Sequence, residues 1–282
     1  MNNLFKEETK NRANYSLFPN ISDKTNNFIL LYLKRFSFIN LFILFQNELA
    51  LRQETLYLTI NLFDRYIQKI NSEKIKNNLN SDLYLIALTC LFIAAKYEEI
   101  YPPYLGDFLD IFNKKYTKRD VLLKEDEILS SLDFQVLITS PLLFLKKFCL
   151  NEKCENEEIK NDLDLCFFCA QFFLELCIIE PKFCELKPSL ESAICLYLAR
   201  KFLLNDKKGN NNNKVWTFDL FFKTNYSEIE IKRYIKIPLK IIKNFFGNVY
   251  TKNFISIPIY VKYNTLEYSR VSFKLKKIFI GE

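Results

Sequence analysis

Cys166-Phe-Phe-Cys169 has the spacing that zinc sites and thiol redox motifs use. A zinc site would need a second pair of ligands at a matching spacing, and the chain contains no histidine. Most of the eight cysteines fall within apolar helical runs, and no secretory signal precedes them. We therefore expect core thiols in a reducing compartment, with no bound metal.

Other catalytic arrangements are absent from the sequence. Without histidine there is no Ser-His-Asp or Cys-His set. No GxxxxGK[ST] or GxGxxG run occurs, and four glycines would scarcely build such phosphate-binding loops. The sequence therefore predicts none of these catalytic or phosphate-binding sites.

Glu125 lies on the apolar face of an expected helix. At 100° per residue from Val121, Ile128 and Leu132 fall within about 20° of that residue and Glu125 at about 40°. A carboxylate buried there without a partner costs several kcal/mol. Glu125 thus needs a cation, either within this chain or on another protein.

Lys96 stands in AAKYEEIYPP (94–103), directly after a long apolar run. It follows Leu85 by eleven residues and therefore shares a helical stripe with it. A lysine near a helix end can also meet the free carbonyls there. Lys96 and Glu125 could pair with each other, or both could face a third group.

The helices that position these residues follow from apolar spacing, caps and the scarcity of glycine and proline. They are expected at about 36–48, 54–70, 82–98, 104–112, 118–132, 141–150, 159–179, 189–204, 217–223 and 228–246. Thr117-Lys-Arg-Asp120 and Ser227-Glu-Ile-Glu230 are capping-box patterns at two helix starts. Residues 1–27 are polar and expected to be loosely ordered. FISIPIYVKY (254–263) favours an extended segment, with a short helix near 262–270.

The run FILLYLKRFSFINLFILF (28–45) imitates a membrane span. Lys34 and Arg35 lie in its middle, where a charge is costly in a bilayer. We expect two shorter helices or one bent helix there, and no membrane partner.

The net charge of +7 comes from 40 basic and 33 acidic residues. Along the chain the basic residues are interspersed with glutamates and asparagines, so the charge favours solubility over nucleic acid as a partner.

An internal repeat suggests two copies of one bundle. LYLIALTCLFIAAKY (83–97) resembles LESAICLYLARKF (190–202), and a shift of 105 residues aligns Cys90 with Cys195 and Lys96 with Lys201. Tyr97 then falls on Phe202.

Three stretches resemble the cyclin box: ETLYLTINLFDRYI (54–67), AAKYEEIYPPYLGDF (94–108) and YTKRDVLLKEDEILSSLDF (116–134). EEIYPP followed by GDF and YTK is similar to A/B-type mitotic cyclins, B-type most closely. LKPSLESAICLYLAR (186–200), VWTFDLFFKTNYSEIEI (215–231) and VKYNTLEYSRVS (261–272) extend the resemblance over about residues 34–272.

The resemblance implies an all-α fold of two tandem cyclin-box five-helix bundles with a short N-terminal segment and a C-terminal tail. The implied parts are the N-terminal segment 1–33, the N-terminal cyclin box 34–138, the C-terminal cyclin fold 139–250 and the tail 251–282.

The resemblance also implies a regulatory subunit that is not an enzyme and needs no cofactor, and that binds and activates a cyclin-dependent Ser/Thr protein kinase as a heterodimer. It would control G2/M-type cell-cycle progression in the nucleus and cytoplasm. By resemblance Lys96 and Glu125 contact the kinase around its mobile αC helix, so that the Lys–Glu pair of the kinase forms. The other implied kinase contacts are apolar at Tyr97, Leu129, Phe134 and Val136 and acidic at Glu98, and a structural pair joins Arg35 to Asp64.

The first helix departs from the family. KRFSFINLF (34–42) stands where MRAILVDWL is expected, and Asn40 and Leu41 replace the acid and the tryptophan. In many relatives this surface is a hydrophobic patch that docks RxL motifs of substrates, so that recognition is open here. The candidate patch residues are Lys34, Ser37, Phe38, Leu41, Leu44 and Tyr84. Arg12 to Asn20 has the spacing of a destruction box, with Tyr15 in place of leucine.

Two alternatives stay open. A cyclin-fold transcription factor would use the positive charge to bind DNA and predicts lysines clustered on one face. A non-activating scaffold cyclin would bind a kinase without raising its activity, as the altered first helix suggests.

Overall fold

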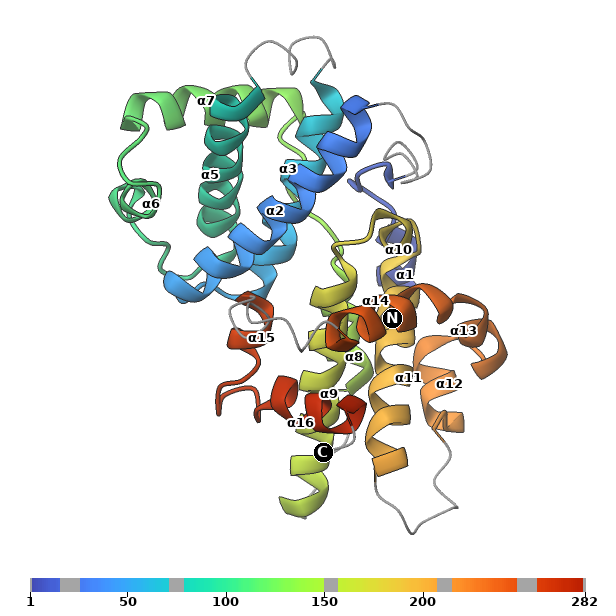
Figure 1. The fold of residues 1–282 in the computed structure, drawn as a ribbon. Coiled ribbons are helices and arrows are strands. Elements are labelled where there is room, and N and C mark those ends of the chain that lie inside the picture. Colours follow the sequence, from blue (N-terminus) through green and yellow to red (C-terminus); the bar gives the residue numbers. More distant parts are fainter. Residues whose placement is uncertain are drawn as a thin grey trace. The chain divides into compact units, whose positions relative to one another are not determined.

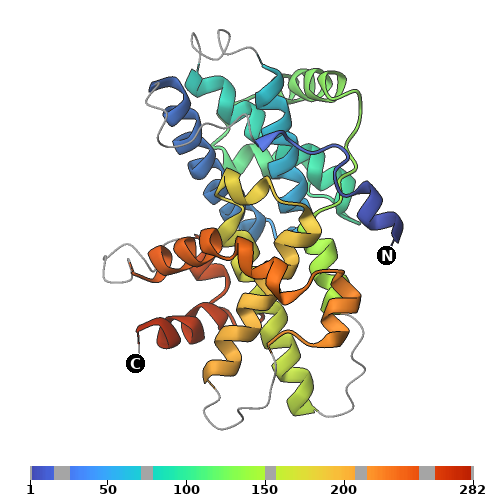
Figure 2. The same ribbon diagram turned by 90° about the vertical axis from the view of Figure 1, so that its right-hand side faces the viewer.

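The computed structural model of the chain describes residues 2–15, 26–70, 79–149, 157–206, 215–247 and 258–280. These residues form α-helices joined by turns and contain no β-strand (Figures 1 and 2), so the predicted all-α class is confirmed. The chain divides into two compact units. One is Thr9–Ser140, and the other joins Met1–Glu8 to Pro141–Glu282.

The first unit is a bundle around one apolar helix. Its described helices are α2 (Asn26–Glu48), α3 (Gln53–Lys69), α5 (Leu79–Glu98), α6 (Leu105–Ile111) and α7 (Lys118–Ser131). α5 packs against both α3 and α7 (Figure 1). Its residues from Ile86 to Ala95 are buried on every side, as expected for a core helix that is apolar all round.

The end of α5 is tied to the start of α3. A carboxylate oxygen of Glu99 accepts hydrogen bonds from the backbone N–H of Arg52, at 2.8 Å, and from the Thr55 hydroxyl. The Arg52 side chain also donates to the Glu98 carbonyl at 3.0 Å. Because the first N–H groups of a helix lack partners within it, Glu99 satisfies one for α3 and thereby fixes the segment after Lys96.

The start of α7 follows its capping box. The Thr117 hydroxyl accepts from the Asp120 backbone N–H at 3.2 Å, and the Asp120 carboxylate accepts from the Thr117 N–H at 2.8 Å. The predicted capping box is therefore confirmed, and it sets the register that places Glu125 on the inner face of α7.

The second unit repeats this plan around α11 (Pro188–Asp206), which packs against α8 (Pro141–Cys149), α9 (Glu157–Cys177) and α13 (Glu228–Tyr234). α12 (Phe218–Thr224) completes five helices, as the internal repeat predicts. Further helices surround them: α1 (Asn2–Glu7), α10 (Pro181–Cys184), α14 (Lys236–Gly247), α15 (Pro258–Lys262) and α16 (Val271–Ile280). Cys90 in α5 and Cys195 in α11 are both fully buried.

Residues 2–15 are not loosely ordered, contrary to the sequence-based expectation. Residues 2–7 form α1, and the buried Glu8 accepts a hydrogen bond from the Ser189 backbone N–H at 3.1 Å. Ser189 lies in the first turn of α11, where a carboxylate is favoured by the free N–H groups of the helix end. The polar composition thus hid a segment that contacts with distant residues hold in place.

Two helix boundaries differ from the prediction near charged residues. α2 is one helix from residue 26 to residue 48, so the alternative of two shorter helices near Lys34 and Arg35 is wrong. The Arg35 charge is instead paired within the bundle. No helix among the described residues is long and apolar enough to cross a membrane. The single helix expected at 228–246 is divided at Ile235 into α13 and α14.

The tail prediction is also wrong where it can be compared. Residues 258–262 are helical rather than extended, residues 263–270 form turns, and the helix lies at 271–280. Lys262 is buried, and its ammonium group meets both carboxylate oxygens of Glu175 in α9 at 2.8 and 2.9 Å. The Tyr263 hydroxyl donates to the same carboxylate at 2.6 Å. This long-range contact overrides the β-branched pattern of the segment.

Candidate functional site

Lys96 and Glu125 meet at the surface of the first unit. The Lys96 ammonium group donates to the Glu125 carboxylate, which pairs the end of α5 with α7. The Glu125 side chain is only 12% exposed, whereas that of Lys96 is 42% exposed. The Lys96 Nζ also lies 4.5 Å from the centre of the Phe92 ring. Of the two arrangements left open by the sequence, the chain on its own adopts the internal pair.

The bundle explains why this pair forms. Val121 and Ile128 are fully buried on the same face of α7, so Glu125 points toward α5 as the helical wheel predicts. Lys96 lies one turn beyond Phe92 and reaches across the rim of the core with its apolar stem. The pair therefore neutralises a mostly buried carboxylate with an ammonium group that stays accessible from outside.

Exposed apolar side chains occur on the elements that carry this pair. Among the predicted kinase contacts, Tyr97 is 51% exposed and Phe134 is 64% exposed. The others, Glu98, Leu129 and Val136, are half-buried, so none of the five lies in the core. The sequence interpretation missed Ile100, Tyr101, Tyr104, Leu122, Leu123 and Leu137, which are also exposed. Aromatic residues beside Pro102 and Pro103, outside any helix, were a signal for some of them. Apolar exposure on this scale is typical of an interaction surface.

The backbone at Phe134 is held in an unusual conformation. Asp133 and Phe134 have φ values of 53° and 54°, in the left-handed region that costs a non-glycine residue about 1–2 kcal/mol. Contacts from α3 support this segment, since the Arg65 guanidinium donates to the Gln135 carbonyl at 2.7 Å and Lys69 donates to the Ser131 carbonyl. This conformation therefore costs stability, and it leaves the Phe134 side chain exposed after the end of α7.

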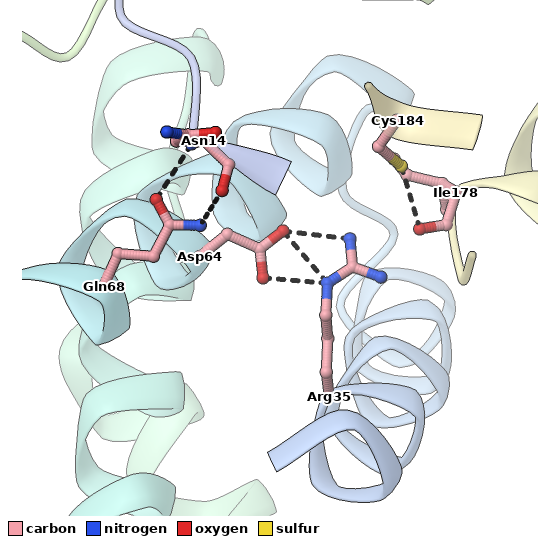
Figure 3. A network of polar contacts seen from close by, with 6 residues as sticks. All are labelled: Asn14, Arg35, Asp64, Gln68, Ile178 and Cys184. Carbon is pink, nitrogen blue, oxygen red and sulfur yellow. Dashed lines mark hydrogen bonds and ion pairs between the residues drawn. The ribbon is translucent and has the colours of Figure 1, made fainter. Parts of the chain in front are cut away.

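Arg35 and Asp64 form a buried pair between α2 and α3 (Figure 3). The Arg35 Nε lies 3.0 Å from Asp64 Oδ1, and an end nitrogen lies 2.9 Å from Oδ2. The Tyr15 ring covers the guanidinium, with 5.5 Å between the ring centre and Cζ. This pair orients α2 against α3 and lies inside the bundle, so we assign it to structure.

The segment before α2 is fastened beside that pair. The Asn14 backbone N–H donates to the Gln68 side chain at 2.9 Å, and Gln68 donates back to the Asn14 carbonyl at 3.1 Å (Figure 3). Tyr15 is buried, and the rest of the destruction-box pattern, residues 16–20, lies outside the described residues. Sequence reasoning missed these contacts because nothing in the local pattern links residue 14 to residue 68.

A small cavity lies between α2 and α5. It has a volume of about 190 Å³ and is lined by Lys34, Ser37, Phe38, Leu41, Leu83 and Tyr84. Five of the six candidate docking-patch residues line this cavity. The sixth, Leu44, is exposed outside the lining. Leu83 also lines the cavity, and the sequence interpretation missed it. The Phe38 and Tyr84 rings are 5.1 Å apart, and partial burial lowers the pKa of Lys34. The cavity lining therefore combines apolar side chains with one lysine and one serine.

The cysteines that the structure describes are not arranged as metal ligands. Cys166 and Cys169 are buried, and burial raises the pKa of the Cys169 thiol, which favours the protonated form. Among the described residues, no group of three or more Cys, Asp or Glu side chains could hold a metal ion. These thiols pack as apolar groups of the second unit.

Comparison with known proteins extends over both units. Residues 1–137 match the family model described as the cyclin N-terminal domain, and residues 139–277 match that of the cyclin C-terminal domain. Cyclin-A2-1 of Arabidopsis thaliana is 31% identical over 225 residues, which are 80% of this chain and 46% of that protein. G2/mitotic-specific cyclin-1 of Saccharomyces cerevisiae is 34% identical over 193 residues, which are 68% and 36% of the two chains.

A solved structure shares the fold. The viral cyclin from herpesvirus saimiri aligns with a TM-score of 0.62 over 85% of this chain and 95% of its own, at 15% identity. The chain spans less than half the length of the curated relatives it matches.

Proposed function

Because this chain belongs to the cyclin family, we propose that it binds and activates a cyclin-dependent Ser/Thr protein kinase as a regulatory subunit without catalysis of its own. The similarity to Cyclin-A2-1 and to G2/mitotic-specific cyclin-1 supports a role in G2/M-type cell-cycle control. For such a role we propose that the protein acts in the nucleus and cytoplasm.

The observation that carries the proposal is the Lys96–Glu125 pair among exposed apolar side chains. A protein kinase needs its αC helix in place, so that a glutamate of that helix can pair with the catalytic-site lysine. At one end of such a helix and in the segment next to it, Lys96 can donate to a free backbone carbonyl and Glu125 can accept from a free backbone N–H. Each would then exchange its internal partner for the kinase.

The surrounding residues would supply affinity by burial. Tyr97 and Phe134 are exposed in the free chain, and covering an aromatic side chain contributes about 1.5–3 kcal/mol. Leu129 and Val136 would extend this apolar contact, and Glu98 would lie near a basic residue of the kinase. Rim charges of this kind affect the rate of association and specificity more than affinity.

The cavity between α2 and α5 is the proposed substrate-docking patch. Lys34, Ser37, Phe38, Leu41 and Tyr84 line it, and the exposed Leu44 would extend it along α2. Leu41 and Lys34 make this patch chemically different from that of RxL-binding relatives.

The test is co-purification with a cyclin-dependent kinase and measurement of histone-type kinase activity. For Lys96→Ala/Glu125→Ala we expect binding to weaken about 30-fold or more, because truncating hydrogen-bonded charges at an interface costs about 2–5 kcal/mol. Unchanged binding and activation by this double variant would contradict the proposed roles. A complex that forms without any rise in activity would instead identify a scaffold.

Asp110→Ala/Lys114→Ala is the matched control. It removes an exposed ion pair between α6 and the turn that follows it, with 3.4 Å between the charged atoms, and neither residue is a proposed kinase contact. Kinase binding should stay at the wild-type level. Thermal unfolding of both double variants, measured without kinase, separates a lost contact from a lost fold.

A further inference from the structure

The positive charge of the chain is concentrated in its C-terminal part. Residues 231–282 contain 11 of the 40 basic residues and 2 of the 33 acidic ones, which gives them a net charge of +9. The preceding 230 residues therefore have a net charge of −2. The interspersed pattern that argued against nucleic acid describes the first part of the chain and not this one.

Five lysines of this region are exposed on two neighbouring helices. They are Lys236, Lys240 and Lys243 of α14 and Lys274 and Lys277 of α16, and we call them the basic face. The two helices pack against each other and against α9 (Figures 1 and 2). The rings of Phe246 and Phe279 stack between them with 4.8 Å between centres.

The lysines of α14 form a regular row. They recur after four and three residues, so they lie on one side of the helix, about 6 and 4.5 Å apart along its axis. Neither α14 nor α16 contains an acidic residue. Across the part of the chain that the structure describes, none of the five lysines forms an ion pair, whereas the nearby Lys232 pairs with Glu228 at 2.8 Å. A row of unneutralised cations attracts a linear polyanion.

Two exposed aromatic side chains accompany the basic face. Tyr234 ends α13 just before the row of lysines, and Phe273 lies on α16. The Lys277 Nζ lies 4.8 Å from the centre of the Phe273 ring. Aromatic rings among cations are the combination with which proteins hold single-stranded nucleic acid, because bases stack on the rings while cations follow the phosphates.

We propose that the basic face binds the phosphate backbone of nucleic acid without reading its sequence. The five lysines contact successive phosphates, and Tyr234 and Phe273 offer stacking positions for unpaired bases. This binding does not depend on the kinase role proposed above, because the residues involved lie in the second unit and include none of the proposed kinase contacts.

The chemistry favours nucleic acid over an acidic protein segment. A single phosphorylated residue is usually held by convergent arginines that bond two oxygens at once, whereas these lysines are spread along helices as separate point charges. An acidic peptide could meet the lysines, but it carries no flat bases to cover Tyr234 and Phe273.

The test is fluorescence anisotropy with the full chain and a labelled single strand of about 20 nucleotides, over roughly 50–200 mM salt. For Lys236→Gln/Lys240→Gln/Lys243→Gln we expect affinity to fall on the order of tenfold to a hundredfold near 100 mM salt. The salt dependence should weaken by about two units of slope, because three phosphate contacts are lost. Lys6→Gln/Lys118→Gln/Lys182→Gln removes the same charge from exposed lysines elsewhere and should bind nearly as wild type.

Several outcomes overturn the proposal. They are equal losses in the two triple variants, no binding by the wild-type chain, and complete displacement of the strand by polyglutamate at equal charge concentration. A Tyr234→Ala/Phe273→Ala variant tests the choice of ligand. It should lose roughly tenfold in affinity for the single strand and little for a duplex of the same length. Unchanged single-strand affinity would contradict the stacking role of the two rings.

Discussion

The two repeats treat the end of their central helix in opposite ways. In the first unit Tyr97, just beyond Lys96, is half exposed. In the second unit the matching residue is Phe202, whose ring packs against Phe173 of α9, at 5.8 Å, and Phe279 of α16, at 4.7 Å. The C-terminal tail therefore covers in the second repeat the position that the first repeat leaves open for a partner.

The difference suggests a division of labour. The same bundle can bind another protein where its rim is open, or become part of a larger folded unit where an extra helix closes the rim. In the second unit α16 closes the rim, and the charges that α16 carries then face outward. Duplication of one fold thus yields a proposed kinase-binding surface and a proposed polyanion-binding surface.

The largest expected effect comes from breaking the anchor of the tail. Lys262→Ala should destabilise the second unit by about 3–5 kcal/mol, because it leaves the buried Glu175 carboxylate without its cation. Urea unfolding followed by circular dichroism would measure this loss. Replacing both partners, as in Lys262→Met/Glu175→Leu, should restore much of the stability. A double variant no more stable than the single one would show that the tail is held by other contacts.

The comparison between Tyr97 and Phe202 can be tested directly. Phe202→Ala should cost roughly 1.5–2.5 kcal/mol of unfolding free energy, about half the value for a fully buried phenylalanine. Tyr97→Ala should cost less than about 0.5 kcal/mol, because its ring is largely in solvent. Of these two variants, only Tyr97→Ala should weaken kinase binding. Equal unfolding free energies in the two variants would contradict the covered-versus-open comparison.

The helix caps are features that the repeats share, so they should respond alike. Thr117→Ala and Ser227→Ala should each cost about 1 kcal/mol, because each hydroxyl satisfies a backbone N–H at the start of its helix. Chemical denaturation of the two single variants gives the comparison. A much smaller cost for Ser227→Ala would indicate that α13 depends on packing rather than on its cap.

The smallest expected effect is on the acid limb of stability. Hydrogen bonds from Thr117 and Ser227 lower the pKa of Asp120 and Glu230 below their ordinary values of 3.8 and 4.5. A carboxyl group whose pKa is lowered by folding stabilises the protein above its ordinary pKa, and this stabilisation is lost as the pH falls through the lowered value. The difference in stability between wild type and Asp120→Asn should therefore shrink below about pH 4. A constant difference from pH 7 to pH 3 would argue against the linkage.

How much could be predicted depended on the distance in sequence between the residues concerned. The period of apolar residues placed Glu125 on the inner face of α7, and the capping boxes located the starts of α7 and α13, because both signals lie within a few residues. The pairing of Arg35 with Asp64, 29 residues apart, was predicted from the family resemblance and not from the local pattern. Periodicity alone could not choose between the internal Lys96–Glu125 pair and a third group.

The failures lie where a distant contact overrides a local preference. Glu8 meets Ser189 across 181 positions, and Lys262 meets Glu175 across 87, so neither α1 nor the helical tail could be foreseen from neighbouring residues. Ile235 shows the same limit on a smaller scale, since nothing in the apolar pattern there announces the division between α13 and α14. The concentration of positive charge in residues 231–282 was missed because the net charge was judged over the whole chain.

Glu99 has a consequence for the speed and strength of association. By holding the backbone of Arg52 and the hydroxyl of Thr55, it makes residues 96–99 a rigid corner before any partner arrives. The rotational freedom of that corner is lost when the chain folds, and it need not be lost again on binding. A partner helix would therefore meet a segment that is already ordered. In a Glu99→Ala chain, the same segment would have to become ordered during each binding event.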